Sequence, residues 1–483
     1  MGELLRHLDL GSSVAESDAA LERYFVETKA FEDLCRDRGD VVTGDKGTGK
    51  TALFRILRSR YRSIPELKNV EVIAAFNPVG NPVFQRIREV DPPLEEGEYI
   101  GLWKAYVFAL VGNWILDLYN GEFSEDMKTL ESLLTKTGLN SADDTAETVF
   151  SQLINRLRAL APKRAKVAMT FTQQGIPILL PEIEFAEESG TAPEPIRHEE
   201  ALGLIERILA SEDFVTWLVL DRLDEAFQGF PSVEVPALRA LLRTYLDLQA
   251  FPHIRLKLFL RNDLFRKIAA GGFVNLSHVS ARRVEIEWDD NNLYALLCRR
   301  MGESKEFVSA LGGDLSHDAL FRATFPEQVD VGENRPTTWN WMLTRIQDGN
   351  RTRPPRNLID LVRDAQAAQL RKEERSPRSY TSGLSLIEGE TLKRGLEKMS
   401  SRRVEDTVLA ESGSDAVYIE RFRGGKAEHS TESIAKVLNM SQGEALAITK
   451  RLVENGFLEV LGEGYRIPFL FRDGLNVTQG KAF

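Results

Sequence analysis

The sequence has few of the features that mark disulfide-bonded, zinc-binding or membrane proteins. Its 483 residues include only two cysteines, Cys35 and Cys298, and neither has metal-ligand spacing. This usage fits a reducing cytosol and argues against disulfides or a zinc site. No uninterrupted apolar run approaches the ~18 to 20 residues of a membrane span. The first residues carry charges and lack the long apolar core of a secretory signal. We therefore expect a cytoplasmic protein without a membrane partner.

The chain also lacks an excess of positive charge. Lysine and arginine number 62 against 73 aspartate and glutamate residues, which gives a net charge of −11. This balance argues against nonspecific nucleic-acid binding over the whole surface, and it leaves a local basic patch open. A hydrophobic content of 42% is that of a globular protein with a full core, and the length allows two or three domains.

The most informative segment is rich in glycine. Gly44-x-x-x-x-Gly49-Lys50-Thr51 matches the nucleotide-binding P-loop pattern in full. A short apolar strand (Val41, Val42) precedes it, and an amphipathic helix is expected to begin at about Lys50. Backbone N–H groups and the helix N-terminus would together form an anion cradle. A glycine-rich turn without a ligand is the alternative.

This motif defines the expected nucleotide-binding residues and their ligands. Lys50 would reach the β- and γ-phosphates of ATP, and the Thr51 hydroxyl would bind Mg²⁺. The nucleotide-binding set consists of Gly44, Asp45, Lys46, Gly47, Thr48, Gly49, Lys50, Thr51 and Ala52.

Apolar segments alternate with helical patterns along residues 40–288. Strands are expected at 69–77, 214–220, 254–260 and 284–288, with an aromatic-rich helix at about 98–119 and a helical segment at about 10–39. Apolar strands separated by helices indicate a parallel sheet covered on both faces. The predicted fold class is therefore α/β, with the three-layer core of a P-loop NTPase.

A group of acids follows the strand at 214–220. An acid at the carboxyl end of a buried strand is where a parallel sheet presents its ligands. Asp221 would hold Mg²⁺ opposite Thr51, while Glu225, with Asp224 beside it, would polarise a water for attack on the γ-phosphate. The alternative is a helix N-terminus capped by surface acids.

These residues carry a resemblance to known families. The segment Val219-Leu-Asp-Arg-Leu-Asp-Glu-Ala226 resembles the extended Walker B motif of STAND ATPases, especially the NACHT type. The chain departs from that pattern at Arg222, where a small residue is usual. More widely, residues 25–60 and 200–475 resemble AAA+ and Orc/Cdc6-like ATPases, which implies a helical lid after the core.

The resemblance implies roles for several polar residues. Arg261 or Asn262 would be the sensor of the γ-phosphate, and Arg282 or Arg283 an arginine finger for a neighbouring subunit. Arg356, or as second choice Arg353, would be the sensor of the lid. For each arginine the alternative is an ordinary solvated surface residue.

The last residues have the layout of a winged helix-turn-helix. A short helix containing Ile434 and Leu438 leads to a longer one containing Ile448 and Leu452, and a hairpin follows around 462–464. Lys450 and Arg451 are balanced by two glutamates on the second helix, whereas DNA readers usually concentrate positive charge. We favour a packing role over DNA binding.

The predicted organisation has three parts. Residues 1–288 form the ATPase core with an insertion at about 121–200, in which 166–181 form a hairpin and 187–195 a polar loop. Residues 289–412 form the helical lid and a helical linker, and residues 413–483 the winged-helix-like domain.

Three functional hypotheses follow. The first is a Mg²⁺-dependent ATPase that acts as a conformational or oligomerisation switch, which the resemblance links to stress response or antiviral defence. It would form a homo-oligomer or engage a partner effector protein. The second is a DNA-binding loader or remodeller of Orc/Cdc6 type. The third is a nucleotide-sensing scaffold without turnover.

Overall fold

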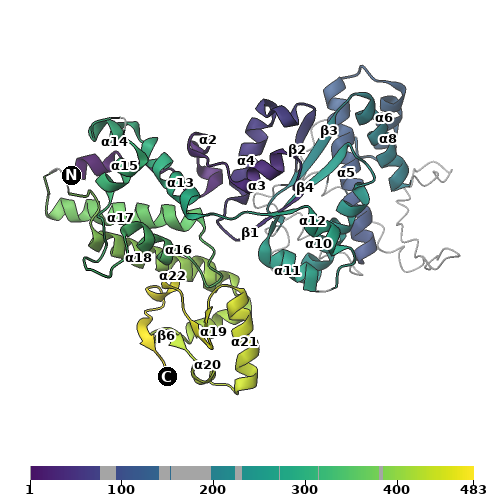
Figure 1. The fold of residues 1–483 in the computed structure, drawn as a ribbon. Coiled ribbons are helices and arrows are strands. Elements are labelled where there is room, and N and C mark those ends of the chain that lie inside the picture. Colours follow the sequence, from purple (N-terminus) through teal and green to yellow (C-terminus); the bar gives the residue numbers. More distant parts are fainter. Residues whose placement is uncertain are drawn as a thin grey trace. The chain divides into compact units, whose positions relative to one another are not determined.

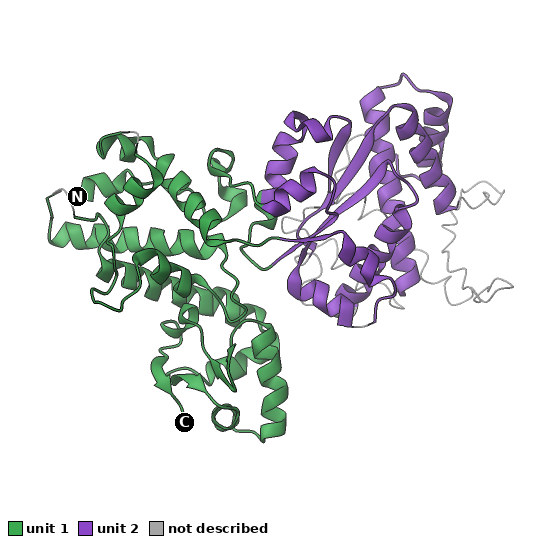
Figure 2. Cartoon of the chain, in the orientation of Figure 1, with its two compact units in different colours: residues 1–28, 45–52, 286–483 green, residues 29–44, 53–285 purple. Residues whose placement is uncertain are grey.

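The computed structural model describes residues 2–76, 94–140, 149, 153, 197–223, 231–270, 272–313, 315–379 and 384–483. The chain divides into two compact units (Figure 2). Unit 1 comprises residues 1–28, 45–52 and 286–483, and unit 2 comprises residues 29–44 and 53–285. The three-part division made from the sequence stays a prediction.

Unit 2 is built on a parallel sheet of five strands (Figure 1). The strands are β1 (Val41–Gly44), β2 (Val70–Phe76), β3 (Val215–Leu220), β4 (Ile254–Arg261) and β5 (Arg283–Glu285), in the order β2-β3-β4-β1-β5. Every pair of neighbours runs parallel. The sequence prediction of a parallel sheet is confirmed, although β5 is shorter than the expected 284–288.

Alternation along the strands gives the sheet two apolar faces. In β4, Leu256, Leu258 and Leu260 belong to the core that includes side chains of α5 (Glu96–Tyr119), α8 (His198–Ser211), α10 (Pro231–Leu248) and α11 (Asn262–Ala270). Phe259 lies between two of these leucines and therefore faces the opposite side. There its ring meets Phe54 of α4 (Lys50–Arg60) at 6.3 Å between centroids. The result is the predicted three-layer α/β arrangement.

The structure shows what two helices of unit 2, α5 and α6, do in the fold. Among the described residues, α5 alone has the length and apolarity of a membrane span, and 78% of its most apolar window is buried. In α6 (Glu125–Lys136), Met127, Leu130 and Leu134 belong to the same core as α5. This part of the predicted insertion is therefore core structure. The hairpin at 166–181 and the loop at 187–195 lie outside the described residues.

Helices dominate the 286–412 part of unit 1, as predicted. They are α13 (Asp290–Gly302), α14 (Lys305–Ala310), α15 (His317–Thr324), α16 (Thr338–Ile346), α17 (Pro355–Arg375) and α18 (Gly389–Arg403).

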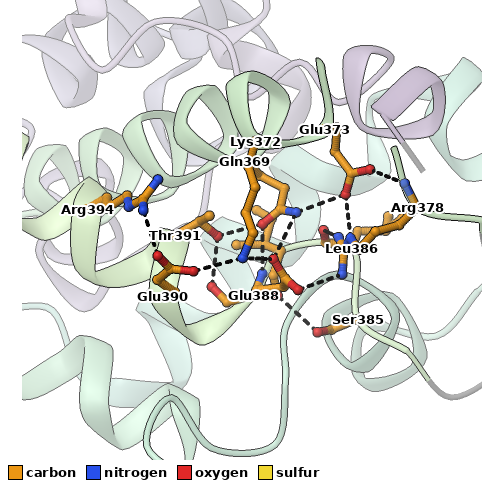
Figure 3. Close-up of polar contacts among 11 residues, drawn as sticks. Gln369, Lys372, Glu373, Arg378, Ser385, Leu386, Glu388, Glu390, Thr391 and Arg394 are labelled. Atoms are coloured by element: carbon orange, nitrogen blue, oxygen red, sulfur yellow. Dashed lines mark hydrogen bonds and ion pairs between the residues drawn. The ribbon is translucent and has the colours of Figure 1, made fainter. Parts of the chain in front are cut away.

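A polar network joins α17 to α18 and to the segment between them (Figure 3). Gln369, fully buried, accepts a hydrogen bond from Thr391 Oγ1 at 2.7 Å and donates one to Glu373 at 2.9 Å. Arg378 Nε donates to the same Glu373 carboxylate at 2.5 Å. Burial alone would raise the pKa of Glu373, but the hydrogen bonds from these donors outweigh burial, and the pKa is lowered. The network thus holds a carboxylate in its charged form within the helix pair.

The C-terminal residues contain the two helices and the hairpin that the sequence predicted. The helices are α20 (Thr431–Leu438) and α21 (Gln442–Glu454), and the hairpin is β7 (Glu459–Leu461) with β8 (Gly464–Arg466). The shorter elements around them are α19 (Ala416–Glu420), β6 (Lys426–His429), α22 (Phe469–Arg472) and β9 (Thr478–Lys481). The strands form a second sheet in the order β7-β8-β6-β9.

The segment at about 10–39, which the sequence predicts to be helical, is helical only in short pieces. The chain forms α2 (Leu21–Tyr24), α3 (Lys29–Cys35) and a single 3₁₀ turn instead. The buried Asp18 explains the break, because it accepts hydrogen bonds from Tyr24 Oη and, at 2.9 Å, from Arg300 Nη2. A buried carboxylate needs such partners, and these contacts fix an irregular backbone.

A charged network is buried at the edge of the sheet where the strands begin. Lys257 is fully buried, and its Nζ lies 2.5 Å from Asp37 and 2.7 Å from Asp40. The same Nζ lies 3.9 Å from the ring centre of Trp217. Arg282 binds both carboxylates, at 3.0 Å to Asp37 and 2.5 Å to Asp40. Two cations thus match two acids, and they tie α3, β1 and β4 to the residue before β5.

Replacing Lys257 by alanine should lower the free energy of unfolding by about 3–5 kcal/mol, because it takes one of two cationic partners from the buried Asp40 carboxylate. Urea-induced unfolding measures this loss. Lys267→Ala removes an exposed lysine of α11 and should change stability by no more than about 0.5 kcal/mol. Equal effects of the two substitutions would contradict a structural role for the network.

Candidate nucleotide-binding site

The P-loop has the curled backbone that the sequence predicts. It leaves β1 at Gly44, and α4 begins at Lys50. Gly47 and Gly49 have φ angles of +81° and +104°, which glycine adopts without steric cost. The Asp45 carbonyl accepts bonds from Thr48 N at 3.3 Å and Lys50 Nζ at 3.1 Å. A loop closed on itself in this way can turn successive N–H groups toward an anion.

Side chains from distant segments of unit 1 hold the loop at two polar points. Thr352 Oγ1 donates to Asp45 Oδ2 at 2.9 Å. Trp288 Nε1 donates to the Thr48 carbonyl at 2.7 Å. Neither residue carries a motif that predicts this role, although Thr352 directly precedes Arg353, the second-choice lid sensor.

The two residues between these points also have partners in unit 1. Lys46 forms an ion pair with Glu411. A Cβ atom added at Gly47 would lie 3.2 Å from Arg356 Cβ and 3.4 Å from Pro354 Cβ. Four successive P-loop residues, 45 to 48, therefore contact the 288–411 part of the chain.

The two arginines proposed as lid sensors occupy different environments. Arg356 lies against Gly47, and its Nε is buried without a hydrogen-bond partner among the described residues. Burial lowers the pKa of its guanidinium, and Asp360 and Glu411 oppose that shift. Arg353 forms an ion pair with Asp290. The geometry favours Arg356, which was the first choice from sequence, and its sensor role stays a prediction.

Unit 2 contributes the residues at the carboxyl ends of its strands. Asp221 directly follows β3 and is 1% exposed. Arg261, the last residue of β4, is paired in register with Gly44. The sheet thus places Arg261 beside the strand end from which the P-loop leaves, as expected for a sensor position.

Both candidate γ-phosphate sensors, Arg261 at the end of β4 and Asn262 at the start of α11, have partners within unit 2. Arg261 binds the Asp263 carboxylate with Nε at 3.0 Å and Nη2 at 3.2 Å. Burial acts to raise the pKa of Asp263, but Arg261 outweighs it and the pKa is lowered. Asn262 Nδ2 donates to Glu285 Oε1 at 2.8 Å. Neither contact decides between the two residues, and the choice stays open.

Arg222 has a backbone conformation that is unusual for a residue with a side chain. Its φ of +58° lies in the left-handed region, where residues with a Cβ atom are disfavoured. The chain keeps this backbone turn after Asp221 while carrying a large side chain.

The two candidate arginine fingers lie at the start of β5, with Arg282 just before the strand and Arg283 as its first residue. Arg282 belongs to the network with Asp37 and Asp40 at the edge where the strands begin. Arg283 lies 3.5 Å from Glu285 and 4.9 Å from the ring centre of Phe265. Arg282 thus already has a structural task in its own chain, and a finger role for either residue stays a prediction.

Asp224 and Glu225, the predicted catalytic acids, lie outside the described residues. Thr51, the predicted magnesium ligand, lies in the first turn of α4, and Ala52 follows it. The positions of the remaining P-loop residues are those given above.

The loop between α16 and α17 contacts both the P-loop and the C-terminal elements of unit 1. Beyond the bond from Thr352 to Asp45, Gly349 N donates to the Gly456 carbonyl at 2.7 Å. Only glycine fits at position 349, because a Cβ there would lie 2.5 Å from the Leu458 carbonyl oxygen. Asp348 Oδ1 accepts from the backbone N–H groups of Asn350 and Thr352, each at 2.9 Å. Burial raises the pKa of Asp348 to about 7.

Fold and loop together define the class. A parallel sheet of order β2-β3-β4-β1-β5, with a P-loop between β1 and α4 and an acid after β3, is the core of a P-loop NTPase. No protein-family model matches the sequence.

Comparison with known proteins adds distant similarities. An 80.3 kDa protein of Escherichia coli strain K12, named after transposon gamma-delta, is 22% identical over 300 residues. The match covers 60% of this chain and only 39% of that protein. Among solved structures, a Walker-type ATPase of Pyrococcus abyssi aligns over 98% of this chain and 100% of its own, with 10% identity and a TM-score of 0.41. The ORC2 protein of Aeropyrum pernix, in ADPNP–ADP complexes, aligns over 96% and 92%, with 10% identity and a TM-score of 0.36.

The left-handed backbone at Arg222 predicts a difference in stability among three substitutions that all remove the guanidinium. Arg222→Gly should leave stability within about 0.5 kcal/mol of Arg222→Lys, whereas Arg222→Val should be less stable by about 1–2 kcal/mol, because a branched Cβ is costly at positive φ. Chemical unfolding of the three variants tests this. Equal stability of the glycine and valine variants would show that the position is not left-handed.

The raised pKa of Asp348 predicts that the free energy of unfolding depends on pH. Its folded pKa of about 7 exceeds the ordinary value of 3.8, so its contribution is fully present below the ordinary value and is lost as pH rises through 7. Asp348→Asn keeps an acceptor oxygen without a charge. It should therefore raise the free energy of unfolding by roughly 1–3 kcal/mol at pH 8 and much less at pH 5. Urea unfolding at both values measures this, and a gain at pH 5 as large as at pH 8 would contradict it.

Proposed function

We propose that this protein binds and hydrolyses ATP with Mg²⁺ and uses the nucleotide to switch its conformation or self-association. The observation that carries the proposal is the set of contacts made by residues 45 to 48. Each of these P-loop residues touches a different point of the 288–411 segment. Any ligand that moves the loop would act on all four contacts at once.

The residues present fit this ligand. Backbone donors of the loop and the start of α4 suit phosphate oxygens, and Lys50 adds a cation. The hydroxyl of Thr51 and the carboxylate of Asp221 are oxygen ligands of the kind that Mg²⁺ prefers. The ion would neutralise charge on the phosphates, and Glu225 would orient the attacking water.

Arg356 supports the switch more directly than the other arginines do. It lies against Gly47, opens α17, and holds a buried Nε without a hydrogen-bond partner among the described residues. A partly buried guanidinium next to a phosphate-binding loop gains most when an anion arrives. Helix α17 would then carry the change along the lid.

DNA binding is the second hypothesis, and the contacts of the C-terminal elements weigh against it. Arg451 binds the Asp415 carboxylate at 2.7 Å, and Arg423 binds Glu420 at 2.7 Å. Arg421 donates to the Leu438 carbonyl. Basic groups already engaged within the chain are poor phosphate anchors. A winged-helix-like packing domain is therefore the role that we propose for residues 413–483.

The test combines binding, turnover and assembly. Wild type should bind ATP and turn it over, Lys50→Ala should bind at least about 10-fold more weakly, and Glu225→Gln should bind without turnover. The mass in solution of wild type and Glu225→Gln, measured with and without ATP, should change when nucleotide binds. Lys305→Ala, an exposed lysine of α14, is the matched control and should behave as wild type.

Each alternative has its own outcome. ATP binding with no effect on mass or shape would overturn the switch. Binding without turnover in wild type, unaffected by Glu225→Gln, would favour the nucleotide-sensing scaffold. Binding of duplex at low salt that is lost when Lys450 and Arg451 are reversed to glutamate would favour the DNA-binding remodeller.

A further inference from the structure

A cavity of about 400 Å³ opens in unit 2 at the edge of the sheet where the strands begin. Val70, Val215 and Arg255, which line it, are the first or second residues of β2, β3 and β4. The P-loop leaves from the opposite edge, where β1 ends at Gly44. This volume lies within the range of small-molecule sites, and the cavity is separate from the nucleotide-binding loop.

Three arginines from two parts of unit 2 line the cavity. Arg36 and Arg38 flank Asp37 just after α3, and Arg255 comes from β4. Within the described part of the chain, the guanidinium groups of Arg36 and Arg255 make no hydrogen bond or ion pair, and that of Arg38 only approaches Asp33 at 4.0 Å. Guanidinium groups with so few carboxylate partners are available to an anion.

The acids at the cavity leave its charge positive. Asp37 is matched by Lys257 at 2.5 Å and by Arg282 at 3.0 Å. Glu66 is the other carboxylate of the lining. The three lining arginines against Glu66 give an excess of two positive charges. A phosphate monoester, with a charge near −2 at neutral pH, matches that excess better than a single carboxylate does.

The rest of the lining is apolar. Leu67 and Trp217 are 2% and 1% exposed, and Val70, Val215 and Pro252 complete the apolar part. Free phosphate would leave this surface without a partner, whereas an organic group joined to the phosphate would cover it. Lys257 fixes the Trp217 ring from one side at 3.9 Å, so part of this lining is held rigidly before any ligand binds.

We propose that the cavity binds a small phosphorylated organic molecule. The guanidinium groups of Arg36 and Arg255 hold the phosphate, with Arg38 beside them, and the organic part lies on Leu67, Val215 and Pro252. The site does not require ATP binding or hydrolysis at the P-loop.

The probe for this site is phenyl phosphate, followed by ligand-observed NMR titration of the full chain. We expect saturable binding with a dissociation constant on the order of 1 mM. Arg36→Gln and Arg255→Gln should each weaken it roughly 10-fold, the loss expected for one charge-assisted hydrogen bond. Arg58→Gln removes an exposed arginine of α4 that does not line the cavity, and it should leave the affinity unchanged.

Other arms separate this site from the P-loop and from simple charge attraction. Lys50→Ala should bind phenyl phosphate as wild type does, whatever happens to ATP. Phenol should not bind, and inorganic phosphate should bind more weakly than the ester. Loss of binding in Lys50→Ala, an equal loss in Arg58→Gln, or equal affinity for inorganic phosphate would each overturn the proposal.

Discussion

The conformation of the P-loop depends on side chains that come from far along the chain. Trp288, Thr352 and Arg356 contact three of its residues, and Glu411 pairs with a fourth. The binding groups of such a loop are backbone N–H donors, so the direction in which they point determines how tightly the loop binds an anion. Holding the carbonyl of Thr48 and the carboxylate of Asp45 fixes the peptide planes next to them. The loop and its distant contacts therefore form one element, and a ligand that reorients the donors must alter those contacts.

The sheet uses charge differently at its two edges. Where the strands begin, Lys257 and Arg282 neutralise Asp37 and Asp40 in a closed set of short contacts. Buried ions matched in number and geometry hold structure in place, and they have little left with which to bind a ligand. Where the strands end, Asp221 directly follows β3, and Arg261 ends the neighbouring β4 and is paired in register with Gly44, where the P-loop starts. A reaction in which charge develops on a bound phosphate fits the edge where the strands end.

Much of the fold could be predicted because its signals are local. A few neighbouring residues are enough to recognise the apolar strands, the glycines at 47 and 49, and the acid after residue 220. The irregular segment at 10–39 could not be predicted, because its helices are interrupted where Asp18 binds Arg300, a residue far away in the sequence. The side-chain contacts that fix the P-loop could not be predicted for the same reason, because neither Trp288 nor Thr352 belongs to a recognisable motif. For the lid sensor, the sequence already ranks Arg356 ahead of Arg353, and the position of Arg356 beside Gly47 favours the same residue.

The loop between α16 and α17 extends this dependence to the C-terminal elements. Thr352 reaches the P-loop, while Gly349, three residues earlier, bonds to the backbone after α21. Asp348 fixes the turn between them by accepting two backbone N–H bonds, so the two ends of this short loop cannot move independently. A side chain at position 349 would collide with Leu458, which makes the contact one of backbone against backbone. A rigid connection of a few residues transmits displacement better than a long flexible one. The loop therefore links Asp45 to the segment between α21 and the β7–β8 hairpin through contacts that involve no residue of α17 or α18.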